Sequence, residues 1–140
     1  MYIIKVGGGG NINLEGVASD LAVLEEPFLV VLGANALRDQ LGQRLGQEKV
    51  QLTSVSGYSS VFSDADAVDL IMMAYSGLSN RRFVEMCQKA GVNAVGLTGL
   101  DGRLIQGRRN RGIKVRENGK TMIKRDFSGK PVEVNVDLLT

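Results

Sequence analysis

The residues best suited to chemistry in this 140-residue chain are Lys5 and the glycines that follow it. Lys5 lies inside an apolar segment, residues 2–6, which runs directly into the glycines of residues 7–10. Glycine turns let backbone amides approach a ligand closely, and a fixed ammonium beside them stabilises negative charge. The pattern is therefore typical of an anion site. A lysine on an edge strand with its head in water explains it equally well.

Further glycine turns follow two other apolar runs. Gly33 and Ala34 come after residues 28–32, and Gly99 comes after residues 93–97. In an open parallel sheet, ligands bind beyond the carboxyl ends of the strands. The standard nucleotide fingerprints are missing, because there is no GxxxxGKS/T and Ile12 stands where the dinucleotide pattern needs glycine.

Several kinds of site are excluded by composition. Histidine is absent and Cys87 is the only cysteine. These counts exclude Ser-His-Asp and Cys-His catalysis, disulfides within the chain and clustered thiolate metal sites. We expect Cys87 to fill a core and no metal site to form from the chain's own residues.

Apolar periodicity predicts strands that alternate with helices. Strands are expected at residues 2–6, 28–32, 50–55, 93–97 and 132–134, and helices between residues 14 and 27, through 37–45, and at 64–75 and 80–90. Residues 112–116 and 121–125 flank Asn118 and Gly119, which favour a type I′ hairpin turn. We predict an α/β fold, a three-layer αβα sandwich with a mainly parallel sheet plus an antiparallel β-hairpin extension.

Polar residues predict where helices begin and end. Asn11 or Asn13 is expected to cap the first helix, and Ser63 with Asp66 to form a capping box for the third. Gly91 is expected to close the fourth helix in a left-handed conformation. The polar stretch of residues 54–63 is expected to be an exposed loop.

Length and hydropathy favour one domain, residues 1–140, in the cytoplasm. The longest apolar run, residues 27–32, is far below the roughly 20 residues of a membrane span. The start also lacks the basic segment and apolar run of a signal peptide.

Longer motifs resemble the amino acid kinase family. Residues 2–8 (YIIKVGG) and 28–34 (FLVVLGA) are similar to its first two strands and their glycine turns. Residues 75–85 (YSGLSNRRFVE) and 89–102 (KAGVNAVGLTGLDG) resemble acetylglutamate kinases. Residues 56–64 (SGYSSVFSD), 107–109 (GRR) and 128–135 (SGKPVEVN) are closest to the branch that acts on glutamate or aminoadipate attached to an acidic carrier protein.

The resemblance covers nearly the whole chain but only about the first half of a family member. It implies an amino-terminal, substrate-binding lobe whose ATP lobe is absent. The implied reaction is phosphorylation of the side-chain carboxylate of an N-blocked glutamate or aminoadipate by ATP and Mg²⁺, giving an acyl phosphate in arginine or lysine biosynthesis. Lys5 would stabilise the transferring phosphoryl group, while Gly7, Gly8 and Gly33 would offer backbone amides. A homodimer and a separate ATP lobe are the implied assembly partners.

Two positions depart from the family pattern. Ala34 stands where a second glycine is usual, and Val61 stands where an arginine usually grips the substrate carboxylate. Valine cannot replace a charge-assisted contact worth roughly 1.5 to 3 kcal/mol. The hydroxyl groups expected to hold the substrate instead are those of Tyr58, Ser59 and Ser60. A module that keeps the fold for binding or oligomerisation but has lost catalysis is the competing interpretation.

Positive charge gathers in the last third of the sequence. Residues 103–130 hold ten Lys or Arg and only two acidic residues, Glu117 and Asp126, so this segment has a net charge of +8. The whole chain has a net charge of +2, so the rest of the chain has a net charge of −6. This asymmetry predicts an acidic partner. The resemblance identifies it as the acidic carrier, docked on Arg108, Arg109 and Arg111. Nucleic acid is disfavoured because Phe127 is the only nearby aromatic for base stacking, and a solvated hairpin with no partner is a further alternative.

Overall fold

The computed structural model describes residues 1–47 and 49–139. It divides into two compact units. The first consists of Met1–Arg44 and Leu70–Leu97, and the second of Leu45–Asp69 and Thr98–Thr140. The expectation of a single domain stays a prediction.

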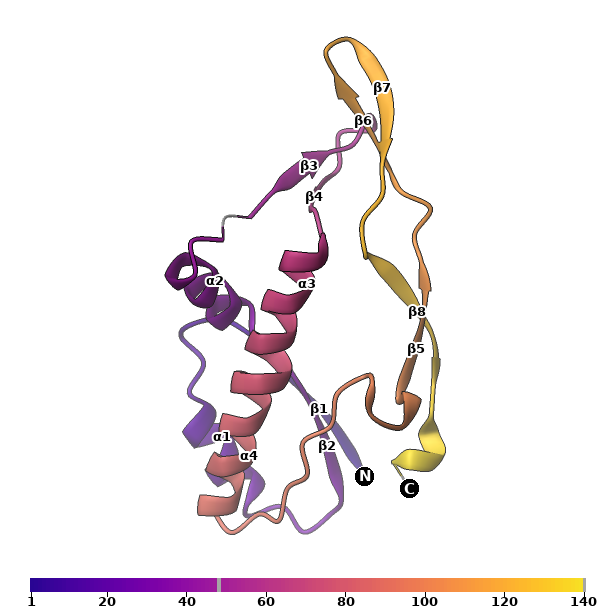
Figure 1. Cartoon of the computed structure of the whole chain (residues 1–140). Helices are drawn as coiled ribbons and strands as arrows, with labels where there is room; N and C mark the ends of the chain where they lie inside the picture. Colours follow the sequence, from indigo (N-terminus) through magenta and orange to yellow (C-terminus); the bar gives the residue numbers. More distant parts are fainter. Residues whose placement is uncertain (48, 140) are drawn as a thin grey trace. The chain divides into compact units, whose positions relative to one another are not determined.

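The first unit is built on a pair of parallel strands (Figure 1). Strand β1 (Tyr2–Val6) pairs with β2 (Phe28–Leu32), while α1 (Leu14–Leu21) connects them and α2 (Asn35–Arg44) follows. The predicted order of strand, turn and helix occurs two times in succession, so this prediction is confirmed. The side chain of Asn13 accepts a hydrogen bond of 3.0 Å from the Gly16 amide, so Asn13 rather than Asn11 caps α1.

One face of this strand pair is covered by helices. Ala18 and Leu21 of α1 and Phe83 and Cys87 of α4 (Asn80–Lys89) form the buried cluster, against which apolar strand residues pack. The expected core role of Cys87 is confirmed, and burial raises the pKa of its thiol. On the opposite face Ile3 is 73% exposed. Because strand side chains alternate, Lys5 shares that uncovered face.

The helices after residue 64 differ from the prediction. α3 (Ala65–Ile71), the π-helical segment η1 (Met72–Ser79) and α4 follow one another without the predicted interruption. Within this run the Asn80 amide donates to the Tyr75 carbonyl, five residues back, which is the spacing of a π-helix. Gly91 has a φ of +88° and ends the run as predicted.

The predicted capping box at the start of α3 is wrong. Asp64 caps this helix, since its carboxylate accepts a bond of 2.9 Å from the Ala67 amide. The Ser63 amide instead donates to the carboxylate of Asp126, over 3.1 Å. A tertiary contact has therefore replaced the local one.

The predicted strand at residues 93–97 is also wrong. Its backbone carbonyls accept hydrogen bonds from side chains of α4: Arg81 donates to Gly96 at 2.5 Å and Asn80 donates to Leu97 at 2.9 Å. Helix side chains therefore satisfy backbone groups that a neighbouring strand would otherwise pair.

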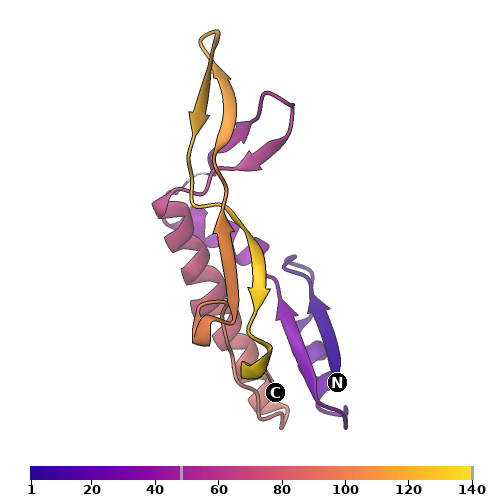
Figure 2. The ribbon, with the colours of Figure 1, turned by 90° about the vertical axis from the view of Figure 1, so that its right-hand side faces the viewer.

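The second unit contains antiparallel strand pairs, two short 3₁₀ helices and most of α3 (Figure 2). The pairs are β3 (Gln51–Thr53) with β4 (Ser59–Val61), β5 (Ile105–Arg109) with β8 (Gly129–Val134), and β6 (Ile113–Glu117) with β7 (Lys120–Lys124); the 3₁₀ helices are η2 (Asp101–Arg103) and η3 (Val136–Leu138).

The second unit confirms two predictions and corrects two. The strand predicted at residues 132–134 lies within β8. The β6–β7 hairpin is confirmed, with φ of +50° at Asn118 and +75° at Gly119, as a type I′ turn requires. The strand predicted at residues 50–55 is shorter, and the stretch predicted as an exposed loop contains β4.

The α/β class and the hairpin extension are thus confirmed. Among the described residues the parallel pairing is limited to β1 and β2, so the prediction of a mainly parallel sheet is corrected; the three-layer arrangement stays a prediction. No helix within the described part of the chain has both the length and the apolar character to cross a membrane.

Candidate functional site

The two glycine turns after β1 and β2 touch each other in the first unit. A Cβ atom on Gly8 would lie 2.5 Å from the Ala34 amide nitrogen, and one on Gly33 would lie 2.7 Å from the Gly8 nitrogen. Real Cβ contacts are not that short, so both positions require glycine. The turns therefore form one continuous backbone surface at the carboxyl ends of the strands.

Lys5 brings a positive charge to this surface. Its Nζ donates to the Val6 carbonyl oxygen over 3.1 Å, and the Gly33 amide donates to the same oxygen over 2.9 Å. The shared acceptor holds the ammonium at the junction of the two turns. The Gly33 amide therefore donates to Val6, and Gly33 also permits the close contact between the turns. The role predicted for its amide toward a ligand stays a prediction.

Ala34 does not obstruct the surface. Only 4% of the residue is exposed. Its methyl group therefore packs inside the unit, which accounts for the tolerance of alanine where the family pattern has glycine.

Two further residues at this end of the strands were not predicted as site residues from the sequence. Asn35, the first residue of α2, accepts a hydrogen bond of 2.5 Å from the hydroxyl of Tyr75 in η1. The neighbouring Ala36 amide donates to the Gly8 carbonyl over 2.8 Å. Only the similarity of residues 75–85 to a kinase motif drew attention to Tyr75, because side chains 40 positions apart leave no periodic pattern.

The hydroxyl groups predicted to hold a substrate lie in the second unit. Tyr58 and Ser60 line a hollow of about 740 Å³, together with Val61 and Lys114. Ser59 is on the other face of β4, where its hydroxyl lies 2.8 Å from that of Thr53. Two of the three predicted hydroxyls thus share a cavity with a lysine, which sequence spacing did not indicate.

A buried carboxylate supports one wall of this hollow. Asp126 is 6% exposed and accepts hydrogen bonds from the Ser63 amide at 3.1 Å and from the amide and hydroxyl of Ser128 at 3.1 and 2.6 Å. Burial alone would raise its pKa. The hydrogen bonds from Ser128 and Ser63 outweigh that effect, and the net pKa is lowered.

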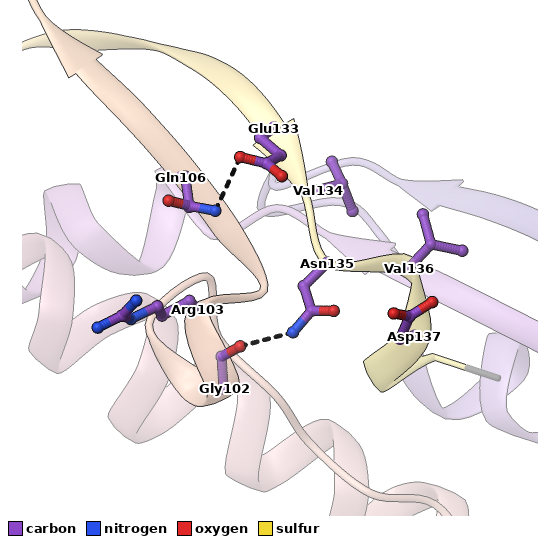
Figure 3. Close-up of a pocket in the computed structure, with 8 residues that line it drawn as sticks. All are labelled: Gly102, Arg103, Gln106, Glu133, Val134, Asn135, Val136 and Asp137. Carbon is purple, nitrogen blue, oxygen red and sulfur yellow. Dashed lines mark hydrogen bonds between the residues drawn. The ribbon is translucent and has the colours of Figure 1, made fainter.

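A smaller cavity of about 310 Å³ lies beside the β5–β8 pair (Figure 3). The Asn135 amide donates to the Gly102 carbonyl at 2.8 Å, and Gln106 donates to Glu133 at 2.9 Å. These four lining groups therefore satisfy one another.

The predicted docking arginines are exposed on or next to β5. Arg108 and Arg109 belong to β5, and Arg111 follows it. The guanidinium carbon of Arg109 lies 4.1 Å from the centre of the Phe127 ring, so Arg109 also stabilises its own unit through a cation–π contact. Arg108 and Arg111 are the better candidates for an external partner.

The described residues contain no group of three or more His, Cys, Asp or Glu side chains arranged to hold a metal ion. Mg²⁺ in kinases is commonly bound by one or two carboxylates together with substrate phosphates. The glycine turns and Lys5 suit the phosphates rather than the ion.

Several curated proteins similar to this chain are named as kinases of LysW-linked amino acids. The LysW-aminoadipate kinase of Thermus thermophilus is 43% identical over 143 residues, covering 99% of this chain and 53% of the relative. The LysW-aminoadipate kinase of Deinococcus radiodurans is 38% identical over 133 residues, covering 92% and 46%. The LysW-aminoadipate/LysW-glutamate kinase of Saccharolobus islandicus is 32% identical over 142 residues, covering 99% and 53%.

These matches confirm the resemblance to the carrier-linked branch of the amino acid kinases. The chain spans about half the length of the curated relatives it matches. No protein-family model matches the sequence.

Proposed function

Because the chain is homologous over nearly its whole length to kinases of LysW-linked aminoadipate or glutamate, we propose that it is the amino-terminal, substrate-side lobe of a carboxylate kinase. Its reaction transfers a phosphoryl group from ATP to the side-chain carboxylate of an N-blocked aminoadipate or glutamate. The product is an acyl phosphate in lysine or arginine biosynthesis. A three-layer αβα arrangement, a homodimer and a cytoplasmic location belong to the same proposal.

The single observation that supports the proposal most is the convergence of Lys5 and the Gly33 amide on the Val6 carbonyl, at the point where the two glycine turns touch. An ammonium fixed beside these turns can neutralise charge on a transferring phosphoryl group. Phosphoryl transfer needs mainly positioning and charge stabilisation, so a chain without histidine can contribute to it.

The chain's residues have distinct roles in this reaction. MgATP, when bound, supplies the phosphoryl group that a substrate carboxylate oxygen attacks, with the bond to the β-phosphate oxygen breaking and ADP leaving. Lys5 and the amides of Gly7 and Gly8 hold and stabilise the phosphoryl oxygens. Within the second unit, the hollow lined by Tyr58, Ser60 and Lys114 suits a carboxylate, and Lys114 supplies there the positive charge that Val61 cannot.

The acidic carrier docks on the basic surface of the second unit. Arg108 and Arg111 are exposed there, within the segment whose charge balance is +8. The relatives' names specify a LysW-linked substrate. A protein-borne substrate needs a surface for its carrier, and opposite charge both guides and orients such an encounter.

A non-catalytic binding or oligomerisation module is the second candidate. Val61 favours it, because no arginine occurs between residues 47 and 77 to grip a carboxylate. It predicts partner binding without turnover.

An acyl-phosphate assay separates the two candidates. The purified chain, alone and mixed with the half of the Thermus thermophilus kinase that it does not cover, is incubated with MgATP and carrier-linked aminoadipate, and acyl phosphate is trapped with hydroxylamine. We expect hydroxamate in the mixture and none with either half alone. No hydroxamate in any sample, with carrier binding retained, would support the module and contradict the kinase lobe.

A further inference from the structure

The π-helical segment η1 brings one side chain to the glycine turns. A π-helical turn holds an extra residue, as the bond from the Asn80 amide to the Tyr75 carbonyl shows, and π-helical turns are frequent at functional sites. Such a turn changes the direction in which the following side chains point. Here α2 packs against η1, and the Tyr75 hydroxyl donates to Asn35 Oδ1 over 2.5 Å.

Asn35 is held to the glycine turns on both sides. The preceding Ala34 nitrogen would lie 2.5 Å from a Cβ on Gly8, and the following Ala36 amide donates to the Gly8 carbonyl over 2.8 Å. The backbone of Asn35 is therefore fixed against the first turn. Its side chain is exposed, where a ligand can reach it.

The hydrogen bond from Tyr75 also fixes the orientation of the Asn35 carboxamide, because it determines where the oxygen and the NH₂ group point. An amide side chain has one accepting oxygen and one NH₂ group with two donors. Since Tyr75 occupies the oxygen, the NH₂ group is directed away from Tyr75. A donor fixed in this way beside the glycine turns suits a phosphate oxygen, because hydrogen bonds to charged groups are the stronger ones.

We propose that Asn35 is an anion-contacting residue of the glycine-turn site, with a phosphate oxygen as its ligand, and that Tyr75 is its positioning residue. This inference rests on the proposed function, because it assumes that the turns bind the phosphate groups of the nucleotide. Neither residue was predicted from sequence.

The test is a double-mutant cycle on the whole chain, with inorganic tripolyphosphate as the probe. Binding is followed by NMR from the amide signals of Gly7 and Gly8. Asn35→Ala removes the donor, Tyr75→Phe removes only the hydroxyl that orients it, and the double variant removes both. Tyr2→Phe, which removes a hydroxyl from an exposed residue of the same unit, is the matched control.

We expect Asn35→Ala to weaken tripolyphosphate binding about tenfold or more, as for loss of a hydrogen bond to a charged group. Tyr75→Phe should weaken it about threefold to tenfold, and the double variant should bind no more weakly than Asn35→Ala alone. Tyr2→Phe should bind as the unaltered chain does. The free energy of unfolding of each variant shows whether affinity merely follows stability.

Two results would overturn the inference. If Tyr75→Phe binds tripolyphosphate as the unaltered chain does, the bond to Asn35 only joins η1 to α2. If the losses from the two single changes add in the double variant, Tyr75 does not act through Asn35. Failure of the unaltered chain to bind tripolyphosphate at all is a different result, because it removes the anion site and the proposed function together.

Discussion

Asp126 shows what one buried side chain contributes in the second unit. Its carboxylate joins Ser63, just before α3, to Ser128, just before β8, through three hydrogen bonds. Its pKa in the folded chain is lowered from an ordinary value of 3.8. The stabilisation is therefore present at pH values above about 3.8 and is lost as the pH falls through the lower, folded-state value.

We predict that Asp126→Asn lowers the free energy of unfolding at pH 6 by about 1 to 3 kcal/mol, because the side chain keeps only one accepting oxygen and cannot accept from both Ser63 and Ser128. The free energy of unfolding of this variant should also fall less steeply as the pH drops below about 4. Urea unfolding between pH 2.5 and 7 measures both effects. Asp20→Asn, at an exposed carboxylate on α1, is the control, and equal acid limbs in the two variants would contradict the account.

The sequence predicted single residues only where neighbours in the chain identify them. Lys5 was found because it precedes a glycine run, and Asn13, with Asn11 as its alternative, because both precede an apolar helix. Asn35, Tyr75 and Asp126 were missed because their partners lie 40 to 63 positions away. Such contacts form only when the chain folds.

At the scale of elements, the contact between the two glycine turns is the feature that most constrains the site. Gly8 lies against the backbone of Ala34 and Asn35, whereas the nearest atom to a Cβ on Gly10 would be the Ala36 Cβ, 3.7 Å away. Gly8 and Gly10, in the same run, therefore differ in whether the structure can accommodate a Cβ atom at that position.

We predict that Gly8→Ala lowers the free energy of unfolding by about 1 to 3 kcal/mol, the usual cost of forcing extra atoms into a packed region. It should also abolish tripolyphosphate binding, since the turns must separate. Gly10→Ala should change stability by less than about 0.5 kcal/mol and leave binding intact. Thermal unfolding and NMR titration of the two variants test this, and similar behaviour of both would show that the turns do not depend on their contact.

The elements that were predicted correctly are those that local pattern determines. β1, β2 and the β6–β7 hairpin were found from apolar runs and from Asn118 and Gly119. The strand predicted at residues 93–97 failed because Asn80 and Arg81 of α4 bond its carbonyls. The apolar pattern of these residues is typical of a strand, but in the structure their backbone carbonyls bond to side chains of a helix.

At the scale of the whole molecule, charge is divided unevenly between parts of the chain. Residues 103–130 carry +8, although the chain carries only +2. Sequence alone predicted this asymmetry, since it depends on composition. The paired functional groups, such as Lys5 with Gly33, required the structure.

We predict that the double change Arg108→Glu and Arg111→Glu weakens binding of the acidic LysW carrier at least tenfold, because it reverses charge at the proposed docking surface. The affinity of the unaltered chain should fall as salt rises, as expected for exposed charges. Calorimetric titration at two salt concentrations measures both effects. The double change Arg44→Glu and Arg82→Glu alters net charge equally, and an equal loss with it would contradict a localised docking surface.

Turnover in a chimera tests most directly whether Lys5 stabilises a phosphoryl group in transfer. In the chimera this chain replaces the corresponding half of the Thermus thermophilus kinase, and hydroxylamine trapping gives kcat and KM for the chimera and its Lys5→Met variant. Lys89→Met, at an exposed ion pair on α4, is the control. We predict that the chimera turns over and that Lys5→Met lowers kcat about 100-fold with little change in KM, as for a contact made mainly in the transition state. Equal kcat values for the chimera and the Lys5→Met variant would contradict the claim.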